Sequence, residues 1–318
     1  MATSAAALLA GLAMLVGGAD LVVRQGTALA GRFGVSPLVV GMTVVSLGTS
    51  LPELAIGINA AQQGNAGLAV GNIVGTNLVN VLLVLGLSAL IRPVEFETRT
   101  LRFDLPVMAG AAVLLLVLAH DGSLSTADGI GLCAYGAGYL TLMIVHTRRS
   151  PAVPDDAVVA AARARPVALQ VVLLVVGLAV IVVGSEFLVD GAVRIARAWG
   201  ATDAFIGLTV VAIGTSAPEL VTTVVSTVRG GDRSLALGNL LGSSVFNIAL
   251  ILGPTVIAAP GAVQVPDDVL ALDLVLMVAT ALVCVPAFFT RRRLSRWEGG
   301  VFVATYVLYT TWLITARL

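Results

Sequence analysis

The sequence GMTVVSLGTSLPEL, residues 41–54, returns in the second half of the chain as GLTVVAIGTSAPEL, residues 207–220. Each copy lies in a long apolar stretch and contains one acidic residue, Glu53 in the first and Glu219 in the second. A carboxylate at membrane depth costs roughly 3 kcal/mol on insertion scales, so it marks a candidate functional site. Two carboxylates at matching positions of a duplicated sequence indicate one site, formed where the two halves meet.

The composition excludes an ordinary soluble domain. Apolar residues make up 58% of the chain and charged residues 11%, and the mean hydropathy is +1.01, whereas a soluble domain has about 25% charged residues. Because a spanning helix needs about 20 apolar residues, we predict an all-α polytopic membrane protein with ten transmembrane helices. The expected spans are 3–23, 37–61, 66–91, 103–120, 127–146, 167–189, 203–228, 234–258, 269–289 and 298–316.

The basic residues predict how the chain is oriented. All 18 of them are arginines. With ten spans, Arg194, Arg197 and Arg317 fall on one side of the membrane and the other arginines fall on the opposite side. Because basic residues concentrate in cytoplasmic loops, we expect a multi-pass protein of the plasma (inner) membrane with both termini outside the cytoplasm. The charge pattern gives no reason to expect nucleic acid as a partner.

A second pair of matching segments extends the repeat. GNIVGTNLVN, residues 71–80, corresponds to GNLLGSSVFN, residues 238–247. Each half holds five expected spans, an odd number, so the second half enters the membrane in the opposite direction. We therefore predict a first five-helix repeat at 1–146, a cytoplasmic linker at 147–166 and an inverted five-helix repeat at 167–318. Inverted repeats are typical of secondary transporters, whose sites lie near the bilayer midplane.

Proline interrupts both copies of the opening motif. Pro52 and Pro218 lack an N–H, and each clashes with the carbonyl four residues earlier, at Gly48 and Gly214. We expect each helix to kink or break there and to free backbone carbonyls, which at membrane depth need a cavity or a ligand. The alternative is a simple kink whose freed groups are satisfied by Ser and Thr. The duplicated glutamate favours a cation site, because Ca²⁺ takes about 6–8 oxygen ligands.

Polar residues also recur at intervals of four in the second motif. They place one polar face on each helix, with small residues at a spacing that lets helices approach closely. Amides that only join helices by hydrogen bonds are the alternative; we favour Asn80 and Asn247 facing the glutamates with neutral oxygens. The residues of these faces are Asn72, Thr76 and Asn80 with Gly71 and Gly75, and Asn239, Ser243 and Asn247 with Gly238 and Gly242.

The paired motifs, GTSLPEL with GNIVGTNLVN and GTSAPEL with GNLLGSSVFN, resemble the repeats of the cation/Ca²⁺ exchanger superfamily, and above all its prokaryotic sodium/calcium exchangers. The resemblance implies that the second, third, seventh and eighth helices surround the ions, while the first and sixth slide past this core. Some relatives, including the potassium-dependent branch, carry Asp where this chain has Asn247, so no K⁺ requirement is expected. The resemblance implies ion ligands at Glu53, Glu219, Thr49, Thr215, Ser50, Ser216, Thr76, Ser243, Asn80, Asn247, Ser46 and Ala212.

These features together predict an antiporter that exchanges Na⁺ for Ca²⁺ by alternating access. An H⁺/Ca²⁺ antiporter on the same fold is the alternative, because burial favours the protonated form of a carboxylate. A channel or an ion sensor is a third possibility. No nucleophile–base pair or cofactor loop supports an enzyme. We expect no cofactor besides the transported ions, and no obligate protein partner beyond the lipid bilayer.

Overall fold

The computed structural model describes residues 2–62, 66–98, 100–149, 166–199, 212–228 and 234–317. The described chain is almost entirely helical, and η denotes a π-helical stretch within a span. The first half contains α1 (Ala2–Phe33), α2 (Pro37–Val40), η1 (Gly41–Val45), α3 (Ser46–Thr49), α4 (Leu51–Gln62), α5 (Ala66–Leu78), η2 (Val79–Leu85), α6 (Gly86–Ile91), β1 (Val94–Glu95), η3 (Thr100–Asp104), α7 (Leu105–Leu118), β2 (Ser123–Leu124) and α8 (Thr126–Arg149). The second half contains α10 (Val167–Ala198), α12 (Ala212–Thr215), α13 (Ala217–Val228), α14 (Ser234–Phe246), η5 (Asn247–Leu252), α15 (Gly253–Ala258), β3 (Val263–Gln264), η6 (Val269–Asp273), α16 (Leu274–Arg291), β4 (Arg293–Leu294) and α17 (Arg296–Arg317).

A described helix lies at each of the ten expected spans, with α17 at the tenth and only the part from residue 212 described at the seventh. Six uninterrupted helical segments of the described chain are long and apolar enough to cross a membrane by length and composition, and three shorter apolar helices occupy 37–49, 217–228 and 269–285. The first part of the seventh expected span, up to residue 211, lies outside the described residues. So does most of the expected linker: α8 continues to Arg149, and the described chain resumes at residue 166.

The first and sixth helices are longer than expected. The sequence predicted ends near residues 23 and 189, where charged residues begin, but α1 continues to Phe33 and α10 to Ala198. Each continuation contains an ion pair one turn apart, Asp20 with Arg24 and Asp190 with Arg194. Such i,i+4 pairs are compatible with an exposed helix and stabilise it slightly. The charged residues therefore lie within the helices rather than at their ends.

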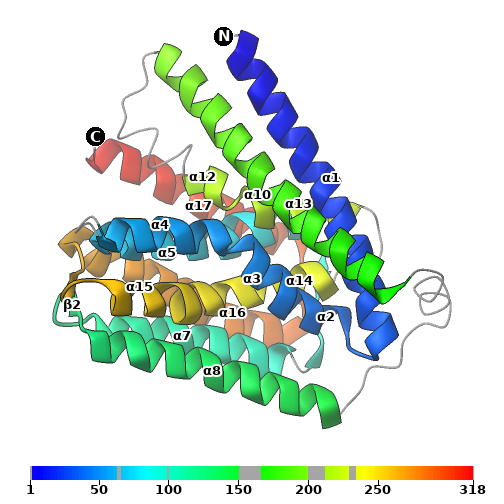
Figure 1. Ribbon diagram of the computed structural model, residues 1–318. Helices are drawn as coiled ribbons and strands as arrows, with labels where there is room; N and C mark the ends of the chain where they lie inside the picture. The colour runs from blue at the N-terminus through cyan, green and yellow to red at the C-terminus, as the bar shows by residue number, and fades with distance from the viewer. Residues whose placement is uncertain are drawn as a thin grey trace.

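Helices α1 and α10 lie side by side and cross the other labelled helices obliquely (Figure 1). Glycines let their backbones touch. A Cβ on Gly11 would lie 2.6 Å from the carbonyl oxygen of Gly184, and one on Gly18 would lie 2.9 Å from that of Gly177. The pair packs on the rest of the bundle through a small separate core that includes Leu15.

The larger core joins the two halves of the chain. It surrounds α5, η2, α7, α14, η5 and α16, with the fully buried ring of Phe246 among its members. The last helix of each half packs on the other half: α8 lies against η5 and α15, and α17 lies against η2 and α6. The polar motifs thus lie within a core that both halves share.

Two short antiparallel strand pairs also connect the halves. In one, β1 pairs with β4 so that Val94 lies opposite Leu294. In the other, β2 pairs with β3 so that Leu124 lies opposite Val263. Each pair therefore links a loop of the first half to a loop of the second by backbone hydrogen bonds.

Candidate cation site

The helix breaks expected from proline are present in both copies of the motif. Helix α3 ends at Thr49, Ser50 has non-helical angles (φ −90°, ψ 6°), and α4 begins at Leu51. In the second copy α12 ends at Thr215, Ser216 forms a turn, and α13 begins at Ala217. Both glutamates lie in the first turn after the break. The break separates Thr49 from Glu53, so the two do not share one continuous helix.

Glycines bring the broken second span against the eighth. A Cβ on Gly41 would lie 2.0 Å from the carbonyl oxygen of Leu235, and one on Gly238 would lie 2.1 Å from that of Leu38. Gly242 makes a similar approach to Met42. The backbones of η1 and α14 therefore touch, as the glycine spacing predicted for this helix, and side chains of the two halves can meet.

Hydroxyl groups from both halves meet at Ser243. Its Oγ lies 3.1 Å from Ser46 Oγ and accepts a hydrogen bond from Ser50 Oγ at 3.5 Å. It donates to Glu219 Oε1 at 3.4 Å. These four residues are fully buried, so the network connects one acidic residue of the second half to the helix break of the first.

Thr49 makes a second connection between the halves. Its Oγ1 donates to the side-chain oxygen of Asn239 at 3.2 Å and contacts the backbone carbonyl of Ser46 at 3.3 Å. Asn239 was part of the predicted polar face but not of the predicted ligand set. The interval of four residues before Ser243 was the signal that could have added it.

Several buried polar atoms of the two motifs have no hydrogen-bond partner among the described residues. Both carboxylate oxygens of Glu53, Oε2 of Glu219 and the Ser216 hydroxyl are buried and unpartnered, as are both amide atoms of Asn80 and Asn247. The structure thus bonds neither asparagine to a glutamate. Buried polar groups are normally paired, so unpartnered oxygens in both copies of the motif are expected if these residues bind a cation.

The charge of the two glutamates also favours a cation site. Glu53 and Glu219 are both 0% exposed, and each lies within electrostatic reach of the other. The ion pairs found in the described chain, Asp20–Arg24 and Asp190–Arg194, involve neither of them. Burying carboxylates without a counter-charge is costly. A cation would supply that charge.

The remaining predicted ligands lie within the same spans. Thr76 on α5 is 2% exposed and Thr215 at the end of α12 is 6% exposed. Ala212 begins α12, and its side chain is outside the described set. No group of three or more His, Cys, Asp or Glu side chains occurs in the described residues. A cation here would depend on hydroxyl, amide and carbonyl oxygens besides the two carboxylates, which suits a hard ion.

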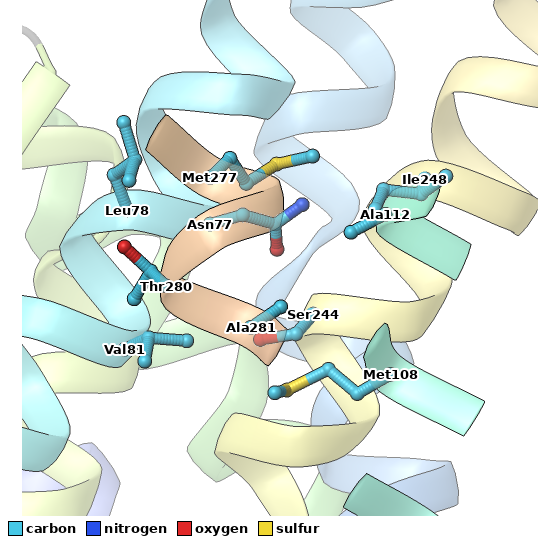
Figure 2. A pocket seen from close by; sticks show the side chains of 10 residues that line it. All are labelled: Asn77, Leu78, Val81, Met108, Ala112, Ser244, Ile248, Met277, Thr280 and Ala281. Carbon is cyan, nitrogen blue, oxygen red and sulfur yellow. The ribbon is translucent and has the colours of Figure 1, made fainter. Parts of the chain in front are cut away.

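A small cavity lies behind the third and eighth spans, between them and α7 and α16 (Figure 2). It has room for about one water molecule. The amide of Asn77 occupies the middle of its lining, between Met277 and Ser244, and neither amide atom has a partner in the described structure. Asn80 lines a neighbouring cavity. Sequence reasoning did not single out Asn77, because it lies off the four-residue repeat.

A family model described as sodium/calcium exchanger protein matches residues 3–145 and 169–315. The chain belongs to this family. The exchanger is 36% identical over 312 residues to a putative antiporter, CaxA, of Alkalimonas amylolytica, covering 95% of this chain and 96% of the relative. It is 33% identical to the sodium/calcium exchanger MaX1 of Methanosarcina acetivorans, with 95% and 96% covered.

A solved structure of the same family also matches this chain. The sodium/calcium exchanger from Methanococcus jannaschii superposes with a TM-score of 0.82 at 30% identity, over 97% of this chain and 98% of that one. This exchanger is therefore a multi-pass membrane transporter of the cation/Ca²⁺ antiport class and not an enzyme. The predicted fold class, ten helices in two inverted repeats, is confirmed.

Proposed function

We propose that this exchanger couples Na⁺ entry to Ca²⁺ export across the plasma membrane, with one ion site formed jointly by the two helix breaks. The observation that carries the proposal is the pair of fully buried glutamates, Glu53 and Glu219, which interact electrostatically and keep three of their four carboxylate oxygens without a hydrogen-bond partner in the described structure. Oxygen-rich surroundings with few charges suit both Ca²⁺ and Na⁺. The name of the relative MaX1, a sodium/calcium exchanger, supports Na⁺ as the coupling ion.

Charge balance explains why such a site exchanges ions. Two ionised glutamates offset one Ca²⁺ or two Na⁺. An empty site keeps both negative charges in a medium of low dielectric, so the unloaded protein changes conformation reluctantly. If a third Na⁺ is bound, the cycle moves one net charge. The membrane potential then contributes about 2.3 kcal/mol per charge per 100 mV to Ca²⁺ export.

The roles of the individual residues follow from their places in the two motifs. Glu53 and Glu219 would bind both ions, and the hydroxyls of Ser50, Ser216, Thr76 and Ser243 would contribute neutral oxygens. The family resemblance adds the backbone carbonyls of Thr49, Thr215, Ser46 and Ala212 to the coordination. Asn80 and Asn247 would close the centre after a small movement, because their amides have no other partner in the described chain.

The membrane arrangement is part of the same proposal. Repeats at 1–146 and 167–318, joined by a linker at 147–166, would place both termini outside and the linker in the cytoplasm. The arginine distribution supports this orientation. Labelling of single cysteines introduced at either end of the chain, from each side of sealed vesicles, would test it.

H⁺/Ca²⁺ antiport is the competing function, because both carboxylate oxygens of Glu53 are buried and lack a hydrogen-bond donor in the described structure, so a proton could take the place of a cation there. The deciding experiment is Ca²⁺ flux in proteoliposomes with Na⁺ and pH gradients imposed separately. Flux that follows the Na⁺ gradient at constant pH supports Na⁺ coupling. Flux driven by pH in the absence of Na⁺ would replace it with H⁺ coupling.

A further inference from the structure

Beyond Glu219, one face of α13 is a row of hydroxyl groups. The spacing from Glu219 is three, four, seven and eight residues, which places all of them on one side of a helix. They are between 0% and 3% exposed, so the row points into the protein rather than into lipid. Its members are Thr222, Thr223, Ser226 and Thr227.

Most of this row lacks hydrogen-bond partners. Helical Ser and Thr in an apolar environment usually donate to the carbonyl four residues earlier, as Ser244 does to Leu240 and Thr255 does to Ile251. The hydroxyls of Thr222, Thr223 and Ser226 have no partner in the described structure. Leaving three adjacent buried hydroxyls unpaired costs free energy, so another state of the protein should supply their partners.

The far end of the row is closed by a contact between helices. Thr227 Oγ1 lies 2.9 Å from Ser88 Oγ of α6, and it also donates to the carbonyl of Thr223 at 2.8 Å. At 1.5 Å per residue, Thr227 lies about 12 Å along the helix axis from Glu219. The hydroxyl face thus reaches from the ion site to the Ser88–Thr227 contact, close to the end of α13.

The matching face of the first half is different. The corresponding residues of α4, counted from Glu53, carry no hydroxyl. Thr255, the counterpart of Ser88, donates within its own helix instead. If the hydroxyls served only to join helices, they would bond across to neighbouring helices, yet of the four only Thr227 does so in the described structure. The α4 counterparts are Ile56, Gly57, Ala60 and Ala61.

We propose that the hydroxyl face of α13 lines a passage for water and partly hydrated cations between Glu219 and the bundle end where Ser88 meets Thr227. The passage opens when that contact separates; this inference rests on the proposed transport function. Neutral hydroxyls suit a passage because they replace part of an ion's hydration without holding the ion tightly. In the expected orientation this end faces the cytoplasm, on the side of Arg92.

Accessibility of introduced cysteines tests the passage. Ser226→Cys and its counterpart Ala60→Cys would be treated in vesicles with a positively charged, membrane-impermeant thiol reagent, and modification located by mass spectrometry. We expect Ser226→Cys to react from the side of Arg92 at least tenfold faster than Ala60→Cys. The structure alone would suggest the opposite order, since Ala60 is partly exposed and Ser226 is 2% exposed. Equal rates, or no modification of Ser226→Cys, overturn the proposal.

Transport separates a passage from a packing role and covers the case in which a cysteine variant fails to fold. For Ser226→Ala and Thr223→Val we expect at least threefold slower maximal Ca²⁺ exchange, an unchanged Ca²⁺ concentration for half-maximal exchange, and an unchanged unfolding temperature. A lower unfolding temperature with normal exchange would instead assign the hydroxyls to packing. Wild-type Na⁺ dependence is measured in the same vesicles, so a failure of the proposed function would be recognised separately.

Discussion

The hydroxyls of Ser46 and Ser243 lie 3.1 Å apart, although 197 residues separate them in the chain. One belongs to the broken second span and the other to the helix that crosses it at the closely packed glycines. Ser243 also donates to Glu219. The contact therefore joins a carboxylate of one half to the helix break of the other, and it gives the shared site its most direct test.

Ser243→Ala should weaken Ca²⁺ binding. It removes one oxygen of the site and a buried hydrogen bond to a carboxylate, worth roughly 2 kcal/mol or about 30-fold in affinity. The measurement is the Ca²⁺ concentration that gives half-maximal exchange. Ser244→Ala is the matched control, because the Ser244 hydroxyl bonds the carbonyl of Leu240 in its own helix. Equal effects at both serines would contradict the assignment.

Glu53→Gln and Glu219→Gln should each abolish Ca²⁺ exchange, by about 100-fold or more, while the protein still inserts and folds. Either change removes half of the fixed charge that balances Ca²⁺, with almost no change in side-chain volume. Uptake of radioactive Ca²⁺ by Na⁺-loaded proteoliposomes measures the loss. Glu95→Gln, at an exposed residue of strand β1, serves as the control. Exchange at the wild-type rate in either site variant would refute the shared site.

Gly11→Ala should separate α1 from α10. The new Cβ would lie 2.5 Å from the backbone nitrogen of Leu188. A side chain could change rotamer to relieve this clash, but the backbone of a packed helix cannot. We expect about 1–3 kcal/mol lower stability, the usual cost of overpacking, seen as a lower unfolding temperature in detergent. Gly17→Ala on the same helix meets nothing within 4 Å and should be neutral or slightly stabilising. If both variants behave alike, the glycine contact has no energetic importance.

Tyr309→Phe should destabilise the fold more than Tyr135→Phe. The Tyr309 hydroxyl donates to the carboxylate of Asp273 at 2.8 Å, whereas that of Tyr135 donates to the backbone carbonyl of Val107 at 2.7 Å. Without the Tyr309 hydroxyl, a buried acidic side chain loses a donor, whereas Val107 lies within helix α7, where its carbonyl also takes part in the helix hydrogen bonding. Thermal unfolding of the two variants gives the comparison. The reverse order would indicate that Asp273 does not depend on this donor.

Features that depend on single residue types and their near neighbours in the chain were predicted correctly from the sequence. The breaks at Ser50 and Ser216 follow from proline, which lacks an N–H and clashes with the preceding turn, and they lie where the motif predicted. The close approach at Gly238 follows from the absence of a side chain. Repetition of these features in both halves was enough to predict the fold class and a joint site.

Features that depend on packing between segments far apart in the chain could not be predicted from the sequence. The π-helical stretches η2 and η5, which contain Asn80 and Asn247, have no signature in residue type. The sequence could not predict that the Asn77 amide lacks a partner, because this depends on the cavity that α7 and α16 help to enclose. The end predicted for α1 was too early because charged residues were used to mark the end of the helix. In the structure Asp20 and Arg24, one turn apart, pair with each other, so the helix continues past them.

The two strand pairs limit how this exchanger can move. The strand pairs β1–β4 and β2–β3 join loops of opposite halves. Rotating one repeat against the other as a rigid body would therefore break backbone hydrogen bonds in both strand pairs. Helices α1 and α10 belong to neither pair, and their glycine contacts hold them closely against each other. A change of access to the ions must therefore leave both strand pairs intact: α1 and α10 can shift together against the bundle, and a single contact between helices, such as Ser88–Thr227, can open without separating the two halves.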